Sequence, residues 1–162
     1  MQLGKLLELC DRSVRHTPRW LGRWCLRWWC SVLLLPGVVL RSLRFGEADR
    51  VLHVYTLERG RVGAVAKGIR RTKSRFGGRL EPLSHVELML HQGSGELGTV
   101  TGASLVRAHR GAREEPYRLS VGLVGLEAML RLFTEQERNP RAFEALTRFL
   151  DVLDEVEVRE TE

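Results

Sequence analysis

The chain has 162 residues, with 26 Lys and Arg against 20 Asp and Glu, and a formal net charge of +6 at pH 7. This length suffices for one domain, or for a small barrel with a helical extension, and it excludes two large domains. Lys and Arg outnumber Asp and Glu by 6 to 2 in residues 1–37 and by 13 to 6 in residues 38–110, whereas the ratio is 7 to 12 in residues 111–162. A basic middle segment favours a polyanionic ligand, because clustered cations release counterions when they bind one. An acidic substrate or a membrane surface would fit the same charge.

Residues 1–37 differ in composition from the rest of the chain, since they hold all four tryptophans and all three cysteines. Trp20, Trp24 and Trp28 recur at four-residue steps among arginines, so a helix here would present an aromatic stripe suited to a membrane interface. The abrupt change of composition at Pro36-Gly37 favours another interpretation, a disordered or helical extension translated from an upstream start. A secretory signal is a third interpretation, although the apolar run before Pro36 is shorter than such a signal needs.

The cysteines and arginines of this segment argue against a zinc site, a disulfide framework and a transmembrane helix. Cys10, Cys25 and Cys30 form no C-x-x-C pair, so the sequence predicts neither a zinc site nor a disulfide framework. Arg23 and Arg27 interrupt every apolar window of the length that crosses a membrane, so no transmembrane helix is predicted.

From Val38 onward the pattern is that of short strands separated by turns. Apolar residues alternate with period two, and turns rich in glycine follow at a spacing of roughly ten residues. Five such strands favour a small closed barrel in residues 38–110, with an OB-fold barrel as the first choice and an SH3-like barrel as the second. The predicted strands are Val38–Leu43, Arg50–Thr56, Arg61–Lys67, His85–His91 and Leu97–Val106.

The period changes to that of helices after a polar bridge at residues 108–115. Pro116 and the Asn139-Pro140 pair mark two helix starts, because proline is tolerated in a first turn and asparagine caps one. The fold class is therefore mostly β plus α, with residues 111–162 as a helical segment that begins a truncated helical domain. The buried helical positions expected are Leu119, Leu123, Leu126, Leu130 and Phe133, then Phe143, Leu146, Phe149, Leu150 and Leu153.

Motifs for nucleotide binding and catalysis are absent or lack their structural context. Residues 93–98 spell G-x-G-x-x-G, but they lie between two predicted strands and open no helix, so a hairpin turn explains them. Lys73-Ser74 lacks the preceding glycine of a phosphate-binding loop. The histidines in predicted strands have no partner at a recognisable spacing, so the sequence predicts no catalytic site and no enzyme.

The most basic stretch is the glycine-rich segment 67–82, between the third and fourth predicted strands. In OB-type barrels such loops bind single-stranded nucleic acid through cations, supplemented by stacking of bases on aromatic rings. Phe76 is the predicted stacking residue, whereas core packing is expected for Phe45 and Tyr55. A solvated loop without a ligand is the alternative. The cations of the loop are Lys67, Arg70, Arg71, Lys73, Arg75 and Arg79.

Several blocks of this sequence resemble the amino-terminal half of the RecO family of bacterial DNA repair and recombination mediators. The most specific are Gly-Glu-Ala-Asp-Arg at residues 46–50 and Lys-Ser-Arg-Phe-Gly-Gly at residues 73–78, and the likeness covers about residues 38–154. Residues 1–37 have no counterpart in the family, and the chain ends where the family continues through its helical domain. Further matching blocks are Val39-Leu40-Arg41, Gly60-Arg61-Val62, Lys67-Gly68, Arg71, Leu80-Glu81-Pro82 and Gly95-Glu96-Leu97.

The resemblance implies a non-enzymatic, cytoplasmic and nucleoid-associated protein that binds single- and double-stranded DNA without base specificity. Such proteins anneal strands and act with RecR, and in many species with RecF, to load RecA on DNA coated by single-strand-binding protein. The docking site for that protein and the zinc module of many members belong to helical parts that this chain does not contain, so no cofactor is expected. The DNA-binding residues implied are Lys67, Arg70, Arg71, Lys73, Arg75 and Arg79, with Arg41, Arg44 and Arg50 as further candidates.

Two other functions remain compatible with the residues alone. A protein-interaction module could use the same basic face for an acidic peptide. An RNA-binding OB-fold domain would show the same pattern of cations and strands.

Overall fold

The structure, a computed structural model, describes residues 32–70, 74, 76–92, 95 and 97–155. The described residues from Leu33 onward belong to one compact unit. Residues 1–31 fall outside the described residues, and with them most of the segment 1–37 that was interpreted as a membrane-interface helix, an extension translated from an upstream start or a secretory signal. So do three of the predicted DNA-binding residues, Arg71, Lys73 and Arg75.

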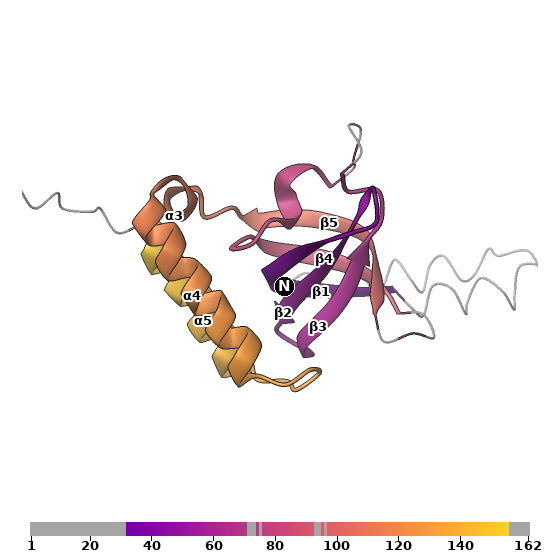
Figure 1. Cartoon of the computed structure of the whole chain (residues 1–162). Coiled ribbons are helices and arrows are strands. Elements are labelled where there is room, and N and C mark those ends of the chain that lie inside the picture. Colours follow the sequence, from indigo (N-terminus) through magenta and orange to yellow (C-terminus); the bar gives the residue numbers. More distant parts are fainter. Residues whose placement is uncertain (1–31, 71–73, 75, 93–94, 96, 156–162) are drawn as a thin grey trace, which may run out of the picture. The chain divides into compact units, whose positions relative to one another are not determined.

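Five strands form a closed barrel in the order β1-β2-β3-β5-β4 (Figure 1). The pairs β1–β2, β2–β3 and β4–β5 are antiparallel, and β3 runs parallel to β5 where Ala64 and Val65 pair with Gly98 and Thr99. The predicted five-stranded OB-fold barrel is confirmed, because each predicted strand has its counterpart. The strands are β1 (Val32–Phe45), β2 (Asp49–Thr56), β3 (Gly60–Ala66), β4 (His85–His91) and β5 (Gly98–Arg107).

Strand β1 begins at Val32, ahead of the predicted start at Val38. Pro36-Gly37, where the change of composition suggested the boundary of a separate segment, lies within this strand. A Cβ atom at Gly37 would lie 2.7 Å from Cγ1 of Val54, so the glycine permits a close approach between β1 and β2. Leu35, on the amino-terminal side of this pair, is buried in the barrel and belongs to the folded domain.

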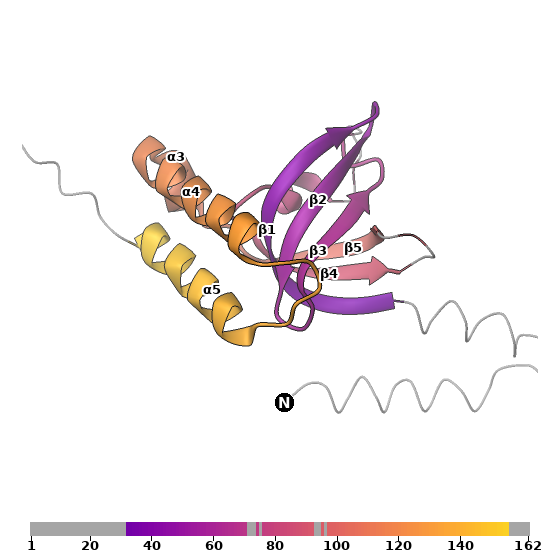
Figure 2. The same cartoon turned by 60° about the horizontal axis from the view of Figure 1, so that its bottom comes forward.

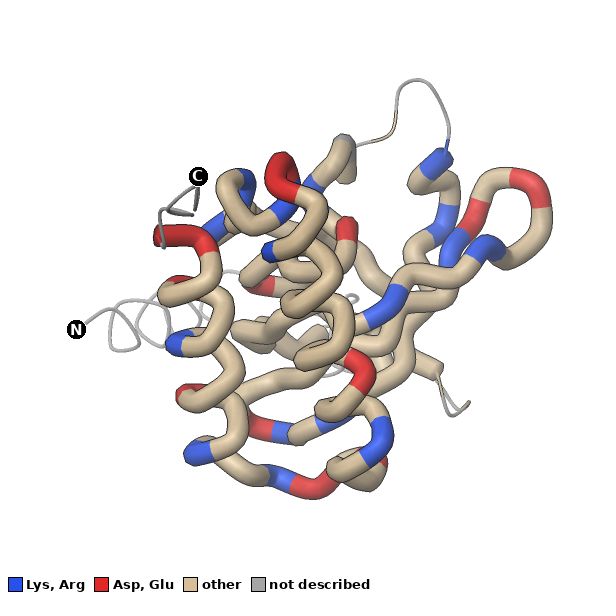
Figure 3. Tube along the Cα trace, turned by 60° about the vertical axis from the view of Figure 1, so that its left-hand side comes forward, with Lys and Arg blue, Asp and Glu red and all other residues tan. Residues whose placement is uncertain are grey.

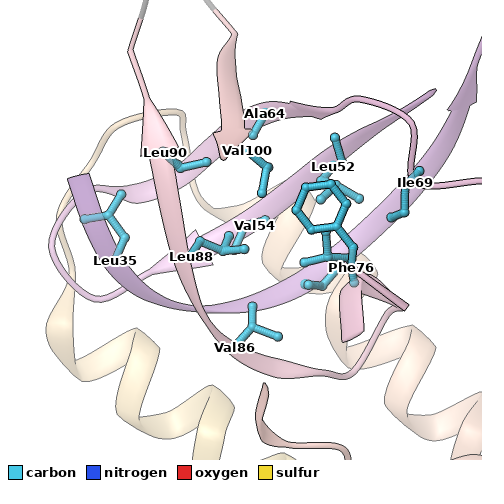
Figure 4. Close-up of a cluster of buried hydrophobic side chains, with 13 residues drawn as sticks. Leu35, Leu52, Val54, Ala64, Ile69, Phe76, Val86, Leu88, Leu90 and Val100 are labelled. Atoms are coloured by element: carbon cyan, nitrogen blue, oxygen red, sulfur yellow. The ribbon is translucent and has the colours of Figure 1, made fainter. Parts of the chain in front are cut away.

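The barrel interior is filled by aliphatic side chains from all five strands together with Phe76 (Figure 4). Phe76 is 1% exposed, and it immediately precedes a 3-10 helix, η1 (Gly77–Leu80), whose Leu80 is also buried. The segment after β3 therefore folds back over the barrel and inserts its aromatic ring into the core. This corrects the prediction that Phe76 stacks on a base, because a buried ring presents no face to a ligand.

Three helices follow the barrel, α3 (Arg110–Glu114), α4 (Pro116–Leu132) and α5 (Pro140–Glu155). The predicted helix starts are confirmed: the Glu115 carboxylate accepts hydrogen bonds from the first backbone amides of α4, and Asn139 accepts one from Ala142 N at 3.1 Å. The short helix α3 lies in the segment expected to be only a polar bridge. Leu123, predicted to be buried, is exposed, because the inner face of α4 is centred on Gly122 and Leu126.

Helices α4 and α5 cover the outer surface of the barrel on one side (Figure 2). The ring of Tyr55 on β2 meets Phe133 edge-on with a centroid distance of 5.4 Å. The guanidinium of Arg61 on β3 donates a hydrogen bond of 2.6 Å to the carbonyl of Leu130. The second buried cluster joins Val38, Leu40, Tyr55 and Leu83 to Ala112, Leu126, Phe143, Leu146 and Leu150 of the helices.

A buried histidine ties the end of β5 to helix α5. His109 adopts a left-handed backbone conformation with φ of 46°, and its imidazole is almost fully buried. Its Nδ1 lies 2.7 Å from the carbonyl oxygen of Leu83, and its Nε2 lies 3.1 Å from a carboxylate oxygen of Asp151. Arg107 pairs with the same carboxylate, so Asp151 anchors two residues of the junction between barrel and helices.

Replacing Leu150 by alanine should destabilise the whole domain. The Leu150 side chain is fully buried between barrel and helices, and emptying such a position typically costs about 2–5 kcal/mol of unfolding free energy. Val152→Ala on the same helix, at a side chain that is 52% exposed, should change the unfolding free energy by less than about 1 kcal/mol. Urea denaturation of both variants measures the difference. Equal destabilisation by both would contradict the proposed packing of α5.

The stability of the fold should depend on pH through His85. Burial lowers the pKa of His85 from its ordinary value of 6.5, and the neighbouring His109 lowers it further, although Asp151 opposes them. Because the unfolded chain binds the proton more readily, the contribution of neutral His85 is fully present above pH 6.5 and is lost as the pH falls through the lowered pKa. Unfolding free energies should therefore fall more steeply below pH 6.5 in the native chain than in His85→Gln. Parallel pH profiles for the two proteins would overturn this assignment.

Candidate nucleic-acid interface

Side chains of β1, β2 and β3 alternate between the barrel interior and an outer face of the sheet. On β2, Leu52 and Val54 point into the interior cluster, which leaves Val51, His53 and Tyr55 on the outer face. Cross-strand pairing places Leu43 beside Val51 and Val51 beside Val65. These three residues therefore form one apolar row across the three strands.

The helices close only one part of this outer face. Tyr55 and its neighbours lie beneath α4 and α5, whereas Leu43 is 46% exposed and Phe45 is 56% exposed. Val51 and Val65 are half-buried. We call the uncovered part, made of Leu43, Phe45, Val51 and Val65, the open outer face. It lies toward the β1–β2 hairpin, away from the helix pair in both ribbon views (Figures 1 and 2).

A β-bulge decides which residues of β1 reach the open outer face. Simple alternation from the buried Val39 would turn residues 41, 43 and 45 into the barrel. The register shifts between Val39 and Arg41, so that Ser42 pairs with the inward-facing Leu52, and Leu43 and Phe45 point outward. The core packing expected for Phe45 is therefore wrong, whereas that expected for Tyr55 is confirmed.

The segment that follows β3 is hydrogen-bonded to the tip of the β1–β2 hairpin. The backbone amide of Gly68 donates to a carboxylate oxygen of Asp49 at 2.7 Å, and the amide of Arg70 donates to the carbonyl of Ala48 at 3.0 Å. The Arg70 guanidinium also donates to the carbonyl of Glu47 at 3.0 Å. Gly68 has a φ of 67°, a conformation that glycine adopts without strain. These three hydrogen bonds hold the start of the basic segment beside the hairpin.

Exposed cations gather at this end of the barrel. Arg44 at the end of β1, and Lys67, Arg70 and Arg79 in the β3–β4 connection, all have exposed side chains. Figure 3 shows Lys and Arg positions beside the hairpin, together with acidic positions in the hairpin itself. One of these carboxylates, that of Asp49, already accepts the hydrogen bond from Gly68. Lys67, Arg70 and Arg79 flank Arg71, Lys73 and Arg75 in the sequence.

Two of the predicted DNA-binding arginines, Arg41 and Arg50, form ion pairs with carboxylates within the fold. Arg50 contacts a carboxylate oxygen of Glu81 at 2.9 Å and the hydroxyl of Ser42 at 3.2 Å. Arg41 contacts Glu127 of α4 at 2.6 Å in a pair that is partly exposed on both sides. Exposed ion pairs contribute only about 0–1 kcal/mol, so a phosphate could compete for Arg41 more readily than for the less exposed Arg50.

His53, which pairs with Arg41 across β1 and β2, adds no positive charge to this face at neutral pH. Burial lowers the pKa of its imidazole most, and the charge of Arg61 lowers it further; Glu135 acts in the opposite direction, and Arg41 makes a smaller lowering contribution. The cationic character of the surface therefore comes from lysine and arginine.

The described part of the chain holds neither a metal-binding cluster nor a membrane-spanning helix. Within it, no group of three or more His, Cys, Asp and Glu side chains is arranged to hold a metal ion. None of the helices in that part is long and apolar enough to cross a membrane.

Comparison with known proteins assigns the barrel to a family. Residues 32–109 match the family described as "Recombination protein O N terminal". The chain is 46% identical over 121 residues to the DNA repair protein RecO of Rubrobacter xylanophilus, an alignment that covers 75% of this chain and 48% of that protein. It is 49% identical over 105 residues to RecO of a Nocardioides species, covering 64% of this chain and 42% of the relative.

A more distant relative shows the same extent of similarity. RecO of Salinibacter ruber is 35% identical over 130 residues, which cover 80% of this chain and 50% of that protein. The chain thus spans about half the length of the curated relatives it matches. The family match begins at Val32, the first residue of β1, so it coincides with the folded barrel. These matches show that the chain belongs to the RecO family of DNA repair proteins, with the barrel as the family's amino-terminal domain.

Proposed function

We propose that this chain binds DNA through the cations at the hairpin end of the barrel and the adjoining open outer face. The observation that carries the proposal is the gathering of Arg44, Lys67 and Arg70 around one hydrogen-bonded hairpin of an OB-fold barrel. OB-fold domains commonly bind oligonucleotides with the face of strands 2 and 3 and with the loop between strands 1 and 2. The open outer face of this barrel includes parts of strands β2 and β3 and adjoins the loop between β1 and β2.

The chemistry of this surface suits phosphate recognition without base specificity. Lysine and arginine side chains contact phosphates in single strands and duplexes alike, because both polymers carry the same charged backbone. The described residues offer a flat row of aliphatic side chains rather than an arrangement of donors and acceptors for base edges. This binding is assigned to side chains alone, without a cofactor or a catalytic step. RNA would satisfy the same cations, so the ligand class rests on the DNA repair family.

The role in the cell that we propose is that of a recombination mediator. Membership of the RecO family supports strand annealing and assistance to RecA loading with RecR and RecF, in the cytoplasm and at the nucleoid. These activities belong to proteins about twice as long as the matched part, so the proposal assigns to this chain the DNA-binding step. Docking of single-strand-binding protein is not included, because the family resemblance places it on other helices.

Replacing Arg44, Lys67 and Arg70 together by alanine should weaken binding to single-stranded and duplex oligonucleotides alike. Each lost phosphate contact should also reduce the slope of log affinity against log salt concentration by about one unit. Fluorescence anisotropy titrations at several salt concentrations measure both effects.

The matched control removes the same charge from the helical segment, with Arg138, Arg141 and Arg148 replaced by alanine. These side chains are exposed and lie just before or on α5, so binding should stay close to that of the native chain. If both triple variants lose affinity equally, net charge rather than the hairpin end is responsible. If the native chain binds acidic peptides but no oligonucleotide, the protein-interaction alternative replaces the proposal.

A further inference from the structure

We propose that Phe45 is a stacking platform for an unpaired base, and that it gives this surface a preference for single strands over duplex. The inference rests on the proposed DNA binding and adds to it a residue that discriminates between the two forms. Of the three aromatic residues of the barrel and its loops, Tyr55 and Phe76 are buried, and only Phe45 is exposed. A ring with a free face is the first requirement for stacking on a base.

The position of Phe45 leaves room for a base. It is the last residue of β1 and pairs with Asp49 across the hairpin, on the outer face that it shares with Leu43. The next residue, Gly46, has a φ of 61°, and a Cβ atom built there would meet no atom within 4 Å. The chain thus turns sharply beside the ring, in a region open to solvent.

The hairpin that carries the ring is held in place by the segment that follows β3. Three hydrogen bonds from Gly68 and Arg70 reach Glu47 and Ala48 of the turn and Asp49, the first residue of β2. A platform fixed before binding loses less conformational entropy when the ligand arrives. The same contacts bring Lys67 and Arg70 near the hairpin, where they could hold the phosphates of the strand whose base stacks.

Stacking should act on single strands alone. In a duplex the faces of the bases are covered by their neighbours, and exposing one requires unstacking that costs a few kcal/mol. In a single strand the faces are accessible at little cost. The cations therefore contribute to both complexes, whereas the ring contributes only to the complex with unpaired DNA.

The arrangement favours a base over an apolar protein partner as the occupant. The exposed ring is adjacent in the chain to the exposed Arg44 and stands beside a segment that holds Lys67 and Arg70. Three exposed cations around an exposed aromatic ring suit a polyanion with aromatic bases, because phosphates can pair with the cations while a base stacks on the ring.

Replacing Phe45 by alanine tests the inference. Affinity for a dT oligonucleotide should fall by about 5- to 150-fold, the equivalent of the ~1–3 kcal/mol that base stacking contributes. Affinity for a blunt duplex of similar length should change by less than about twofold, because no base face is available. Phe45→Trp should keep the single-strand affinity, since it keeps an aromatic face.

Two further variants separate stacking from simple apolar contact. Phe45→Leu keeps an apolar side chain without a π-face, so it should lose single-strand affinity nearly as alanine does. Val106→Ala removes an exposed apolar side chain from β5, outside the open outer face, and should leave the affinity for both ligands close to that of the native chain. Thermal unfolding should show that all four variants keep the native fold.

The outcomes distinguish this inference from the proposed function. If the native chain binds neither oligonucleotide, the DNA-binding proposal itself fails. If the native chain binds both but Phe45→Ala binds single strands as well as the native chain does, only the stacking role is overturned. Equal losses on single strand and duplex, or full affinity in Phe45→Leu, would likewise overturn it.

Discussion

The burial of Tyr55 beneath helices α4 and α5 is the contact on which the arrangement of this surface depends. Tyr55, Val38 and Leu40 lie on the outside of the barrel and would form an exposed apolar patch if the barrel stood alone. Leu126, Phe143 and Leu150 cover them, and removing that apolar area from water supplies the main stabilisation of the joint. Because the helices extend over only one part of the outer face, they convert that part into core and leave the rest uncovered. The boundary of the candidate site is thus set by helix packing.

The same joint changes how the basic charge of the chain should be interpreted. Arg41 and Arg61 are held by Glu127 and by the carbonyl of Leu130, so each connects the barrel to the helical segment. Arg50 connects β2 to Glu81, in the connection that closes the end of the barrel. A count of all cations in the described part of the chain therefore overstates the positive charge that is available to a ligand. The exposed cations that do gather around the hairpin owe their position to backbone hydrogen bonds from Gly68 and Arg70.

The sequence predicted the five strands, the starts of both long helices and, Leu123 excepted, their inner faces, because period and capping are local properties. It did not predict the burial of Phe76 or the exposure of Phe45, since both depend on contacts between distant segments. Phe76 enters the core because its segment folds back over the barrel, and Phe45 leaves it because the bulge after Val39 reverses the alternation of β1. One sign was readable: uninterrupted alternation would have turned Arg41 into the barrel interior, where an arginine without a partner is very costly. The change of composition at Pro36-Gly37 also suggested a boundary that the fold does not have. Gly37 lies within β1, where it permits a close contact with Val54.

The bulge in β1 turns Phe45 toward the surface that holds the exposed cations. The proposed DNA binding would therefore have two contributions, from cations and from stacking, that respond differently to salt. Cation–phosphate contacts weaken as salt rises, with a steeper dependence for duplex than for single strands because duplex DNA has the higher charge density. Stacking on an aromatic ring displaces no counterions, so the contribution proposed for Phe45 should persist when the contacts of Lys67 and Arg70 are screened. Raising the salt concentration should therefore weaken both complexes while increasing the preference for single strands. Such a surface would hold unpaired DNA selectively under the conditions in which its electrostatic attraction to duplex is weakest.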